Sequence, residues 1–440
     1  MTKFRLFNFG CRTSQAEGAA LKGELLQAGL VEADGIEHAN VAVLNTCTVT
    51  APADAEARQI IRRIRRQNPA CQILVTGCYA QRAAEEIAQL SGVRWVVGNS
   101  HKHTLADILR AFAEEREIRP DPPALSPTTP ADILVGLLGD EFHFTPVDAG
   151  DRTRPVLKVQ DGCDAHCSYC IVPSVRGRSR SLAPGKVVEQ TRQLEQEGFL
   201  EIVLSGINLG TYGRDLSGGF GLRELLEQIL AATSAIRLRL SSLEMVDVTS
   251  RLIDLVAREP RMAKHFHLPL QSGSDRVLEF MNRPYTAAEY VDCLLAIHQQ
   301  LPNCGVGADV MAGFPGEDAD DHVATLQVID ALPFTYLHVF PYSIRPGTVA
   351  ASLAGAVDGR VARERAEQIR NIMREKRARF LNSQVGCQLQ VLTLHEARGD
   401  FRLGLSGNFL QVAVAGSVPA NRMVVGKVQH VQDGLLYASI

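Results

Sequence analysis

Three cysteines, Cys163, Cys167 and Cys170, lie within eight residues near the middle of the 440-residue chain. Gaps of three and then two residues let one loop place three thiolates on one concave surface. Thiolate is a preferred ligand of iron, and a [4Fe–4S] cube held entirely by protein takes four cysteines. The next cysteine is Cys293. One iron would therefore remain open to bind a small molecule.

The same three cysteines could instead form a disulfide knot, a zinc site or a cluster of buried thiols. Zinc would need a fourth ligand nearby, and the available side chain, His166, sits between two of the cysteines. The spacing therefore favours a reactive iron–sulfur cluster.

This loop resembles that of the radical S-adenosylmethionine (SAM) family, with an aromatic residue, Tyr169, before the last cysteine. The resemblance implies that Cys163, Cys167 and Cys170 are the catalytic cluster ligands. It implies that the open iron chelates the amino and carboxylate groups of SAM and passes it an electron. The resulting 5′-deoxyadenosyl radical would abstract hydrogen from an unactivated C–H bond.

Residues 1–112 are expected to form a doubly wound parallel α/β domain, because short apolar runs alternate there with helix-like segments. These runs cover residues 5–9, 41–44, 72–76 and 94–97.

Each of the first three runs is followed two or three residues later by a cysteine, Cys11, Cys47 or Cys78. Ligands of such sheets gather beyond the carboxyl ends of the strands, so the three thiols should meet in one crevice. They are expected to hold a second [4Fe–4S] cluster with an open iron, the alternative being three buried core thiols. Gly10 and Gly77 would let the chain turn sharply beside it, although ordinary strand-to-helix turns also use glycine.

Residues 113–150 are expected to be a linker, with ordered structure resuming near Arg154, because five prolines interrupt regular structure there. They are Pro120, Pro122, Pro123, Pro127 and Pro130.

Residues 151–383 are expected to form a partial (β/α)6 barrel with a connecting helix, since a strand–helix pattern repeats six times. The strand candidates cover residues 155–160, 201–205, 236–240, 265–270, 305–311 and 336–341. Active loops of such barrels follow the strands, so this rim could hold SAM. The candidate SAM contacts are Gly206, Glu244, Gln271, Ser272 and Arg345, each of which could instead serve its loop.

Residues 384–440 alternate like strands with regular glycine breaks and are expected to form a small five-stranded β-barrel. It resembles the TRAM domain, an RNA-binding barrel. Because it has few basic residues, Phe401 and Phe409 are the candidates for stacking on bases.

The three-cysteine first domain, the radical SAM barrel with Gln271-Ser-Gly-Ser and Gly313-Phe-Pro-Gly-Glu, and the small β domain together resemble the methylthiotransferases. The resemblance implies that one cluster cleaves SAM while the other carries the sulfur that is inserted into a C–H bond. It also implies an electron donor such as flavodoxin or ferredoxin, and a sulfur donor.

Family substrates are N6-modified adenosine 37 in the anticodon loop of tRNA and an aspartate of a ribosomal protein. The segment from Asn45 to Arg63 is most similar to the branch that acts on N6-threonylcarbamoyladenosine (t6A) at C2, rather than on N6-isopentenyladenosine or the ribosomal aspartate. Cys11 is followed by Arg-Thr-Ser-Gln where relatives usually show Lys-Val-Asn-Gln.

Two basic runs, at 58–66 and 360–379, could contact phosphates, although such runs are also common on solvated helix surfaces. The formal net charge of −3 gives no global case for nucleic acid binding. We expect a cytoplasmic protein, because neither a signal-peptide pattern nor an apolar span long enough for a membrane occurs.

Two other hypotheses remain open. One is a radical SAM enzyme whose first cluster only relays electrons, and the other is a non-enzymatic iron–sulfur sensor that binds RNA. The rim loops argue against the sensor, and the expected open iron in the first domain argues against a relay.

Overall fold

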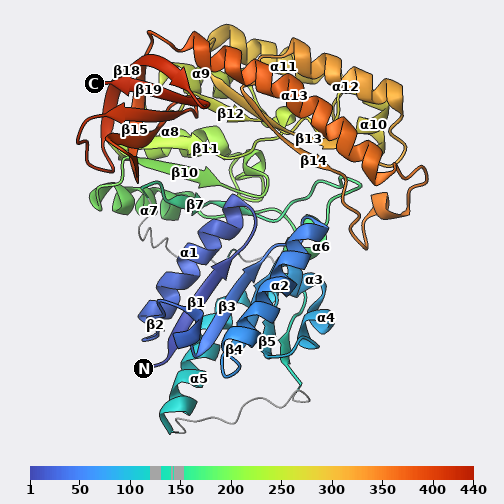
Figure 1. Ribbon diagram of the computed structural model, residues 1–440, viewed down its shortest axis with the longest axis vertical. Helices are drawn as coiled ribbons and strands as arrows, with labels where there is room; N and C mark the ends of the chain where they lie inside the picture. Colours follow the sequence, from blue (N-terminus) through green and yellow to red (C-terminus); the bar gives the residue numbers. More distant parts are fainter. Residues whose placement is uncertain (119–129, 140–141, 143–152) are drawn as a thin grey trace.

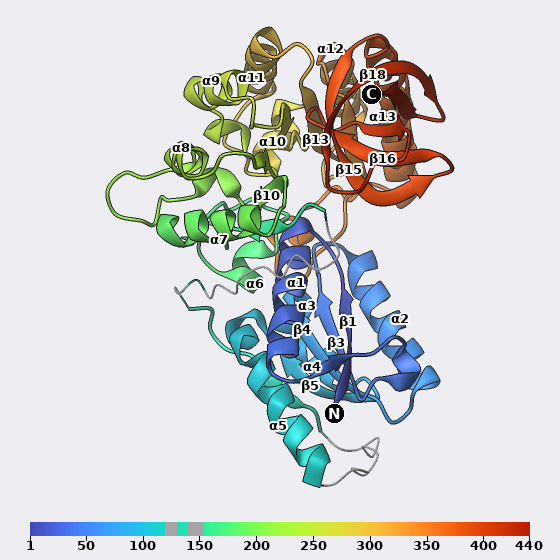
Figure 2. The ribbon, with the colours of Figure 1, turned by 90° about the vertical axis from the view of Figure 1, so that its left-hand side faces the viewer.

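The computed structural model describes residues 1–118, 130–139, 142 and 153–440. Figure 1 shows an α/β domain in blue and cyan below a partial barrel in green to orange, with a small red β-barrel against the barrel's flank. Figure 2 shows the same order from the side, with helix α1 reaching up to the barrel. Within the described residues, no helix is both long and apolar enough to cross a bilayer.

The N-terminal domain is built on a six-stranded parallel sheet in the order β2-β1-β3-β4-β5-β6. The strands are β1 (Lys3–Asn8), β2 (Val31–Glu32), β3 (Val41–Thr46), β4 (Gln72–Gly77), β5 (Val93–Val97) and β6 (Asp132–Leu134). The doubly wound prediction is confirmed.

Helices cover both faces of this sheet because its central strands carry apolar side chains in both directions. α1 (Arg12–Gln27) and α5 (Leu105–Ile118) pack on one face. α2 (Ala51–Gln67) and the short α3 (Cys78–Arg82) and α4 (Ala84–Ala88) pack on the other.

The expected linker differs from the structure at both ends. α5 continues to Ile118, and β6 pairs in parallel with β5, so ordered structure resumes before Arg154. The expectation of no regular structure around Pro120, Pro122, Pro123 and Pro127 falls on residues outside those described.

The six predicted strands of the central region form two three-stranded parallel sheets, β11-β10-β7 and β12-β13-β14, joined by a bridge between Leu238 and Met262. They are β7 (Val156–Lys158), β10 (Glu201–Ser205), β11 (Arg237–Leu240), β12 (His265–His267), β13 (Gly305–Ala312) and β14 (Tyr336–Pro341). The partial barrel is confirmed.

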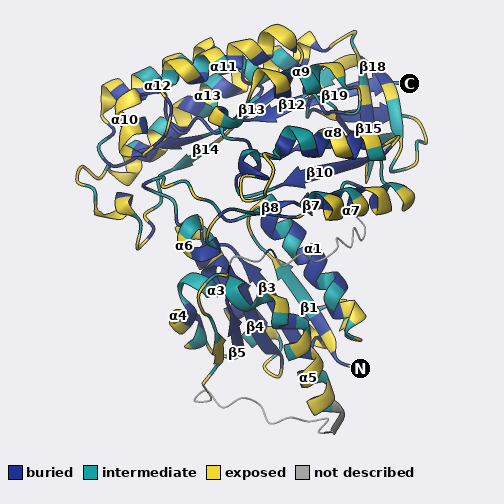
Figure 3. Cartoon of the chain, turned by 180° about the vertical axis from the view of Figure 1, so that it is seen from behind, coloured by how far each residue is buried: buried dark blue, intermediate teal, exposed yellow. Residues whose placement is uncertain are grey.

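Helices surround this barrel and bury one large apolar core against the strands, while their outer faces are exposed in Figure 3. They are α7 (Pro184–Gln196), α8 (Leu222–Ala232), α9 (Ser250–Arg258), α10 (Asp275–Phe280), α11 (Ala287–Gln300), α12 (Ala319–Ala331) and α13 (Gly359–Ser383).

The C-terminal region is the expected closed five-stranded barrel, in the order β15-β16-β17-β19-β18. Its strands are β15 (Gln388–Arg398), β16 (Phe401–Ser406), β17 (Gln411–Ala415), β18 (Met423–Gln432) and β19 (Leu435–Ser439).

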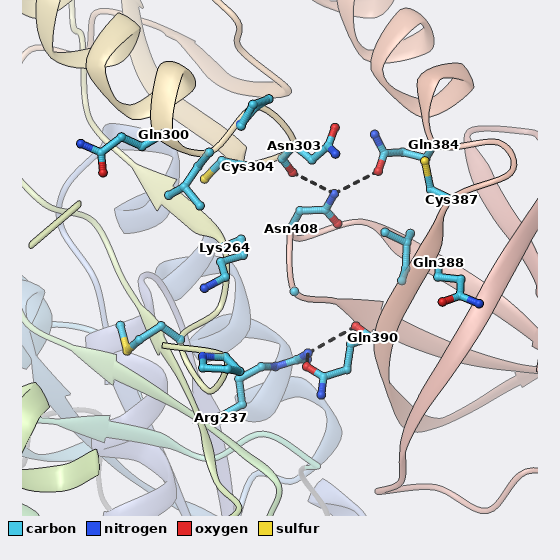
Figure 4. Close-up of a pocket in the computed structure, with 16 residues that line it drawn as sticks. Arg237, Lys264, Gln300, Asn303, Cys304, Gln384, Cys387, Gln388, Gln390 and Asn408 are labelled. Atoms are coloured by element: carbon cyan, nitrogen blue, oxygen red, sulfur yellow. Dashed lines mark hydrogen bonds between the residues drawn. The ribbon is translucent and has the colours of Figure 1, made fainter. Parts of the chain in front are cut away.

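The turn between β16 and β17 docks on the central barrel beside a cavity of about 390 Å³ (Figure 4). The side-chain amide of Asn408 donates to the Asn303 carbonyl at 3.1 Å and to Gln384 Oε1 at 3.3 Å. Arg237 donates to Gln390 in the same view. The small barrel is thus fixed to the central one by buried polar contacts.

Helix α1 forms contacts that attach the N-terminal domain to the central barrel. The Thr13 and Ser205 hydroxyls lie 3.4 Å apart, and Ala16 packs against Val156 and Val203. One turn further, buried Glu17 pairs with Lys102, Lys158 and Arg176, at 2.8 Å from the lysine of β7. Cys11, at the start of α1, is consequently held at the domain boundary.

Candidate active site between two cysteine groups

The central cysteine loop leaves the short strand β8 (Gln160–Asp161), as the sequence predicted for a loop after the first barrel strand. At Gly162 the backbone has φ +71°, and an added Cβ would lie 1.9 Å from the Arg178 carbonyl oxygen. The Cys170 amide donates to the Cys167 carbonyl at 3.0 Å, and the Ala165 amide donates to Cys163 Sγ at 3.4 Å. These constraints curl the chain so that its three thiols share one loop.

Arg283 is a residue of this site that sequence reasoning missed. Its guanidinium donates to Cys167 Sγ at 3.2 Å and forms an ion pair with Glu244. Burial alone would lower the pKa of Arg283, but Tyr169, Glu244 and other neighbours raise it overall. A fixed positive charge therefore lies against this thiol, where it would stabilise a thiolate.

The first cysteine group along the chain, Cys11, Cys47 and Cys78, forms at the carboxyl ends of three neighbouring strands. Cys11 is the N-cap of α1, Cys47 follows β3, and Cys78 begins α3. At Gly10, where φ is +94°, an added Cβ would lie 2.9 Å from Cys47 Sγ, so the turn beside Cys11 meets the next cysteine directly. Asn99 Nδ2 donates to Cys78 Sγ at 3.5 Å. The structure thus brings together three thiols that are distant in sequence.

The thiols of both groups fit a cluster better than a single ion. Burial raises the pKa of Cys47 to about 12, with smaller contributions that include Cys78 and Cys11, and it raises the pKa of Cys170 to about 12. Within the described part of the chain, His267, Asp309 and His338 form the one trio whose ligand atoms all lie within 4.8 Å of one another. The cysteines are spaced more widely than one tetrahedral zinc requires, as a larger iron–sulfur cube would need.

One short helix joins the two groups. α6 (Val172–Arg176) begins two residues after Cys170, and Val175 and Ile171 pack directly against Cys78. Its last residue, buried Arg176, bonds to Asp161 and Glu17 and lies close enough to Cys78 to lower that thiol's pKa, against the larger opposing effect of burial. Helix α6 therefore connects the two cysteine groups through direct packing.

A cavity of about 190 Å³ lies between the two cysteine loops. Val49 and Thr50 line it from the Cys47 side, and Tyr169 and Cys170 line it from the other. Ile171 and Val172 continue this second wall into α6, and the barrel rim supplies Gln271, Asp309, Met311, Phe340, Pro341, Tyr342 and Ser343. A substrate here would stand between the two sets of thiols.

Gln271 is the predicted SAM contact that lines this cavity. It is 7% exposed and adopts φ +64°, a conformation that is uncommon for a residue with a side chain. Among the described residues, no group hydrogen-bonds to its Oε1. A buried acceptor held in this way is suited to a ligand's hydrogen-bond donor.

Asp309, also in the cavity wall, is held by two histidines that sequence reasoning did not single out. His267 Nε2 and His338 Nδ1 lie 3.2 and 3.1 Å from its Oδ1. Burial would raise the pKa of Asp309, but these contacts lower it well below its usual range. Successive side chains of a strand alternate between its two faces, so His267 on β12, Asp309 on β13 and His338 on β14 all face the inside of the barrel. This two-residue periodicity is the sequence signal that could have identified them.

The other four predicted SAM contacts have partners in the protein. Gly206 approaches Gln160 so closely that an added Cβ would lie 2.7 Å from its Oε1. The Ser272 hydroxyl lies 3.3 Å from that of Thr325 and accepts from the Ser274 amide, and Glu244 pairs with Arg283.

Arg345 lies at the domain boundary. It donates to Asp54 and to the Thr48 carbonyl, and Arg82 donates to the same carboxylate. Because Thr48 directly follows Cys47, this network ties the first cysteine group to the barrel rim.

Phe409 does not lie on an outer surface of the small barrel, where a base could stack on it. Its ring packs against His265 and Tyr336, with centroid separations of 4.5 and 5.4 Å, inside the central barrel. Phe401 packs edge-on against Tyr437 at 5.0 Å. The prediction of Phe409 as an RNA-stacking residue is therefore wrong, because the β16–β17 turn inserts into the neighbouring barrel.

A partial (β/α)6 barrel with a three-cysteine loop after its first strand defines the class of radical SAM proteins. Family models agree: residues 157–329 match the Radical SAM superfamily, and residues 3–98 match the "Uncharacterized protein family UPF0004". The fold is shared with the radical SAM methyltransferase TsrM from Kitasatospora setae, at a TM-score of 0.56 and 15% identity, covering 80% of this chain and 77% of that one.

Relatives with known names identify the family within this class. The threonylcarbamoyladenosine tRNA methylthiotransferase MtaB of Aquifex aeolicus is 36% identical, covering 94% of this chain and 97% of the relative. The tRNA-2-methylthio-N(6)-dimethylallyladenosine synthase of Pelotomaculum thermopropionicum is 33% identical, covering 89% and 86%. The chain belongs to the radical SAM methylthiotransferase family. It is an enzyme whose cofactors are SAM and two [4Fe–4S] clusters.

Proposed function

We propose that this enzyme inserts a methylthio group at C2 of N6-threonylcarbamoyladenosine 37 in the anticodon loop of tRNA. The observation that carries the proposal is the cavity bounded on one side by the Cys47 loop and on the other by Tyr169 and Cys170. One reacting carbon placed there would face both groups. The MtaB relatives of Aquifex aeolicus and Bacillus subtilis, each 36% identical, support the choice of nucleoside.

We assign the two groups different roles. Cys163, Cys167 and Cys170 would hold the cluster that binds SAM, because Cys170 lines the same cavity as Gln271 and the barrel rim. Cys11, Cys47 and Cys78 would hold the cluster that carries sulfur. When bound, the clusters supply the electron and the sulfur, which an electron donor such as flavodoxin or ferredoxin and a sulfur donor must replenish.

Helix α2 is our candidate for the tRNA surface. Arg62, Arg63 and Arg66 are exposed along it, and within the described residues none of them forms an ion pair. In the second basic run, residues 360–379, several arginine charges already pair with acidic side chains of the protein. Arg365 pairs with Glu317 at 2.6 Å, and Arg370 and Arg374 pair with Glu367. Phosphate contacts therefore fall more naturally to α2, which begins beside the Cys47 loop.

Mass spectrometry of tRNA nucleosides from cells that lack this gene tests the proposal. Methylthiolated t6A should disappear while methylthiolated isopentenyladenosine persists, and a plasmid copy of the gene should restore it. The reverse pattern would move the enzyme to the dimethylallyladenosine branch. No change in either nucleoside would contradict a tRNA substrate and favour a protein one.

A further inference from the structure

The lumen of the central barrel carries more positive than negative charge. Arg154, Arg237 and Arg239 all pair with one fully buried carboxylate, Glu201, at 3.3, 2.5 and 2.9 Å. Burial would raise the pKa of Glu201, but these guanidinium groups lower it well below its usual range. Three cations thus share one anion in a place with little water.

The second set of partners of these arginines is neutral. Arg237 and Arg239 also donate to the carbonyls of Leu405, Ser406 and Gly407 in the docked turn of the small barrel. These contacts satisfy the N–H groups but leave the excess charge unchanged.

Arg12 adds a fourth guanidinium to this lumen. It lies 5.5 Å from the Phe409 ring, whose other side-chain neighbours include Arg239 and Tyr336. Among the described residues it forms no ion pair or hydrogen bond through its side chain. Burial lowers the pKa of Arg12, and the nearby cations Arg154 and Arg239 lower it further, while Tyr336 and Glu201 act in the opposite direction.

Among the described residues, no acidic side chain pairs directly with Arg12. Tyr336 Oη lies 2.8 Å from His265 Nε2 and 2.9 Å from His267 Nδ1, within a chain of hydrogen bonds that ends at Asp309. Burial and the adjacent cations depress the pKa of His265 well below its ordinary value. The Asp309 carboxylate already contacts His267 and His338. A half-buried guanidinium without an acidic partner is costly unless an anion from outside completes the site.

The position of Arg12 relates it to the reaction. It directly follows Cys11 and begins α1, which the Thr13–Ser205 contact fixes on the barrel. The Tyr336–His267–Asp309 chain connects its surroundings to the wall of the cavity between the cysteine groups. Arg12 is therefore next in sequence to a thiol of the first cysteine group, and its surroundings are linked to the wall of that cavity.

We propose that Arg12 binds the carboxylate of the threonylcarbamoyl group and so selects t6A over nucleosides with an uncharged N6 substituent. This inference rests on the proposed function. A planar guanidinium can hold a carboxylate through two parallel hydrogen bonds, and a site built for a charged group rejects analogues that lack it. A tRNA phosphate offers the same anionic chemistry, and the experiment separates the two sources.

The test uses the cluster-loaded enzyme and anticodon stem-loops that differ only at adenosine 37. The nucleoside is t6A, its methyl ester or unmodified adenosine, and fluorescence anisotropy gives each Kd. Wild-type enzyme should bind the t6A loop about tenfold to a hundredfold more tightly than the ester, the range expected for one charge-assisted hydrogen-bonded contact. Arg12→Gln should bind the two equally, and Arg12→Lys should recover part of the preference.

Arg62→Gln is the matched control, because it removes an exposed arginine that we assign to phosphate. It should weaken all three loops by the same factor and preserve the preference for t6A. If Arg12→Gln also weakens all three equally, Arg12 binds phosphate and the inference fails. An unchanged preference for t6A over the ester in Arg12→Gln would overturn it as well.

If the proposed function itself is wrong, the experiment gives a different result from those above. Wild-type enzyme would then form no methylthiolated product from the t6A loop, whatever its binding preference. If Arg12→Gln does not fold, as judged by iron content and thermal unfolding, Arg12→Lys decides. A lysine variant whose preference for t6A over the ester equals that of the wild type would contradict the need for a two-point guanidinium contact.

Discussion

Arg345 Nη1 donates to Asp54 Oδ2 at 2.6 Å across the boundary between the barrel and the N-terminal domain. Each side chain is 5% exposed, and the same carboxylate also accepts from Arg82 and the Thr48 hydroxyl. This carboxylate therefore links the loop that carries Cys47 to the rim of the barrel. A buried ion pair thus adds to the apolar packing between the parts that carry the two cysteine groups.

Asp54→Asn should therefore damage coupling between the two sites. Leaving the buried Arg345 and the half-buried Arg82 without their carboxylate should cost about 3–5 kcal/mol of unfolding free energy. Methylthiolated product should fall more than cleavage of SAM to 5′-deoxyadenosine, because Asp54 bonds to Thr48 beside Cys47 and, among the described residues, has no hydrogen bond to the central cysteine loop. Denaturant unfolding and product analysis measure both. The control, Glu367→Gln, removes the exposed partner of Arg370 and Arg374 and should cost less than about 1 kcal/mol. Equal losses in both variants would contradict this account.

The separate roles of the cysteine groups predict different losses. Anaerobic reconstitution should give about eight iron per chain, and replacing Cys163, Cys167 and Cys170 together by Ala should leave about four. Cys47→Ala should still cleave SAM but form no methylthiolated product, whereas Cys167→Ala should lose both reactions. Cys71→Ala is the control, since this cysteine lies in the apolar core at the start of β4. Full product from Cys47→Ala would refute the sulfur-carrying role.

Much of this site could be predicted because a parallel sheet turns sequence spacing into position. Cys11, Cys47 and Cys78 each follow a strand, and adjacent parallel strands end at one edge, so their convergence needed no tertiary information. β6 was not predicted, because three residues after a proline-rich stretch carry too weak a pattern. The prediction for Phe409 failed for another reason. Its partners lie in the central barrel, and a single sequence does not reveal which domains touch.

Gly162→Ala should disrupt the central cysteine loop. A methyl group there would lie 1.9 Å from the Arg178 carbonyl, and φ +71° disfavours any residue with a side chain. We expect iron content to fall by about half and SAM cleavage to be lost, since one cluster would no longer bind. Gly185→Ala is the control, because an added Cβ at this position near the start of α7 meets no atom within 4 Å. Normal iron content in Gly162→Ala would show that the loop tolerates the change.

Cluster loading should become more favourable as pH rises. Burial raises the thiol pKa of Cys47 and of Cys170 to about 12, so both are protonated at pH 7–9 without iron. Each must release one proton to become a thiolate ligand. Iron affinity should therefore rise about tenfold per pH unit for each such thiol. Proton release during anaerobic iron titration in weak buffer measures this, and Cys47→Ala should release fewer protons. Iron affinity that is unchanged between pH 7 and 9 would contradict it.

The arginines of α2 should contribute electrostatic binding to tRNA that does not depend on the nucleoside at position 37. Arg62, Arg63 and Arg66 are exposed and lie on the helix that begins at the Cys47 loop, where the Ala51 amide donates to Ser343 at 3.0 Å. Replacing the three by Gln should lower the slope of log affinity against log salt by about 0.7–0.9 for each phosphate contact that is lost. Binding of anticodon stem-loops between 50 and 200 mM salt measures the slope. Replacing Arg370 and Arg374, whose charges are already paired with Glu367, provides the comparison and should change the slope little. If the α13 variant lowered the slope and the α2 variant did not, the tRNA surface would lie on the connecting helix instead.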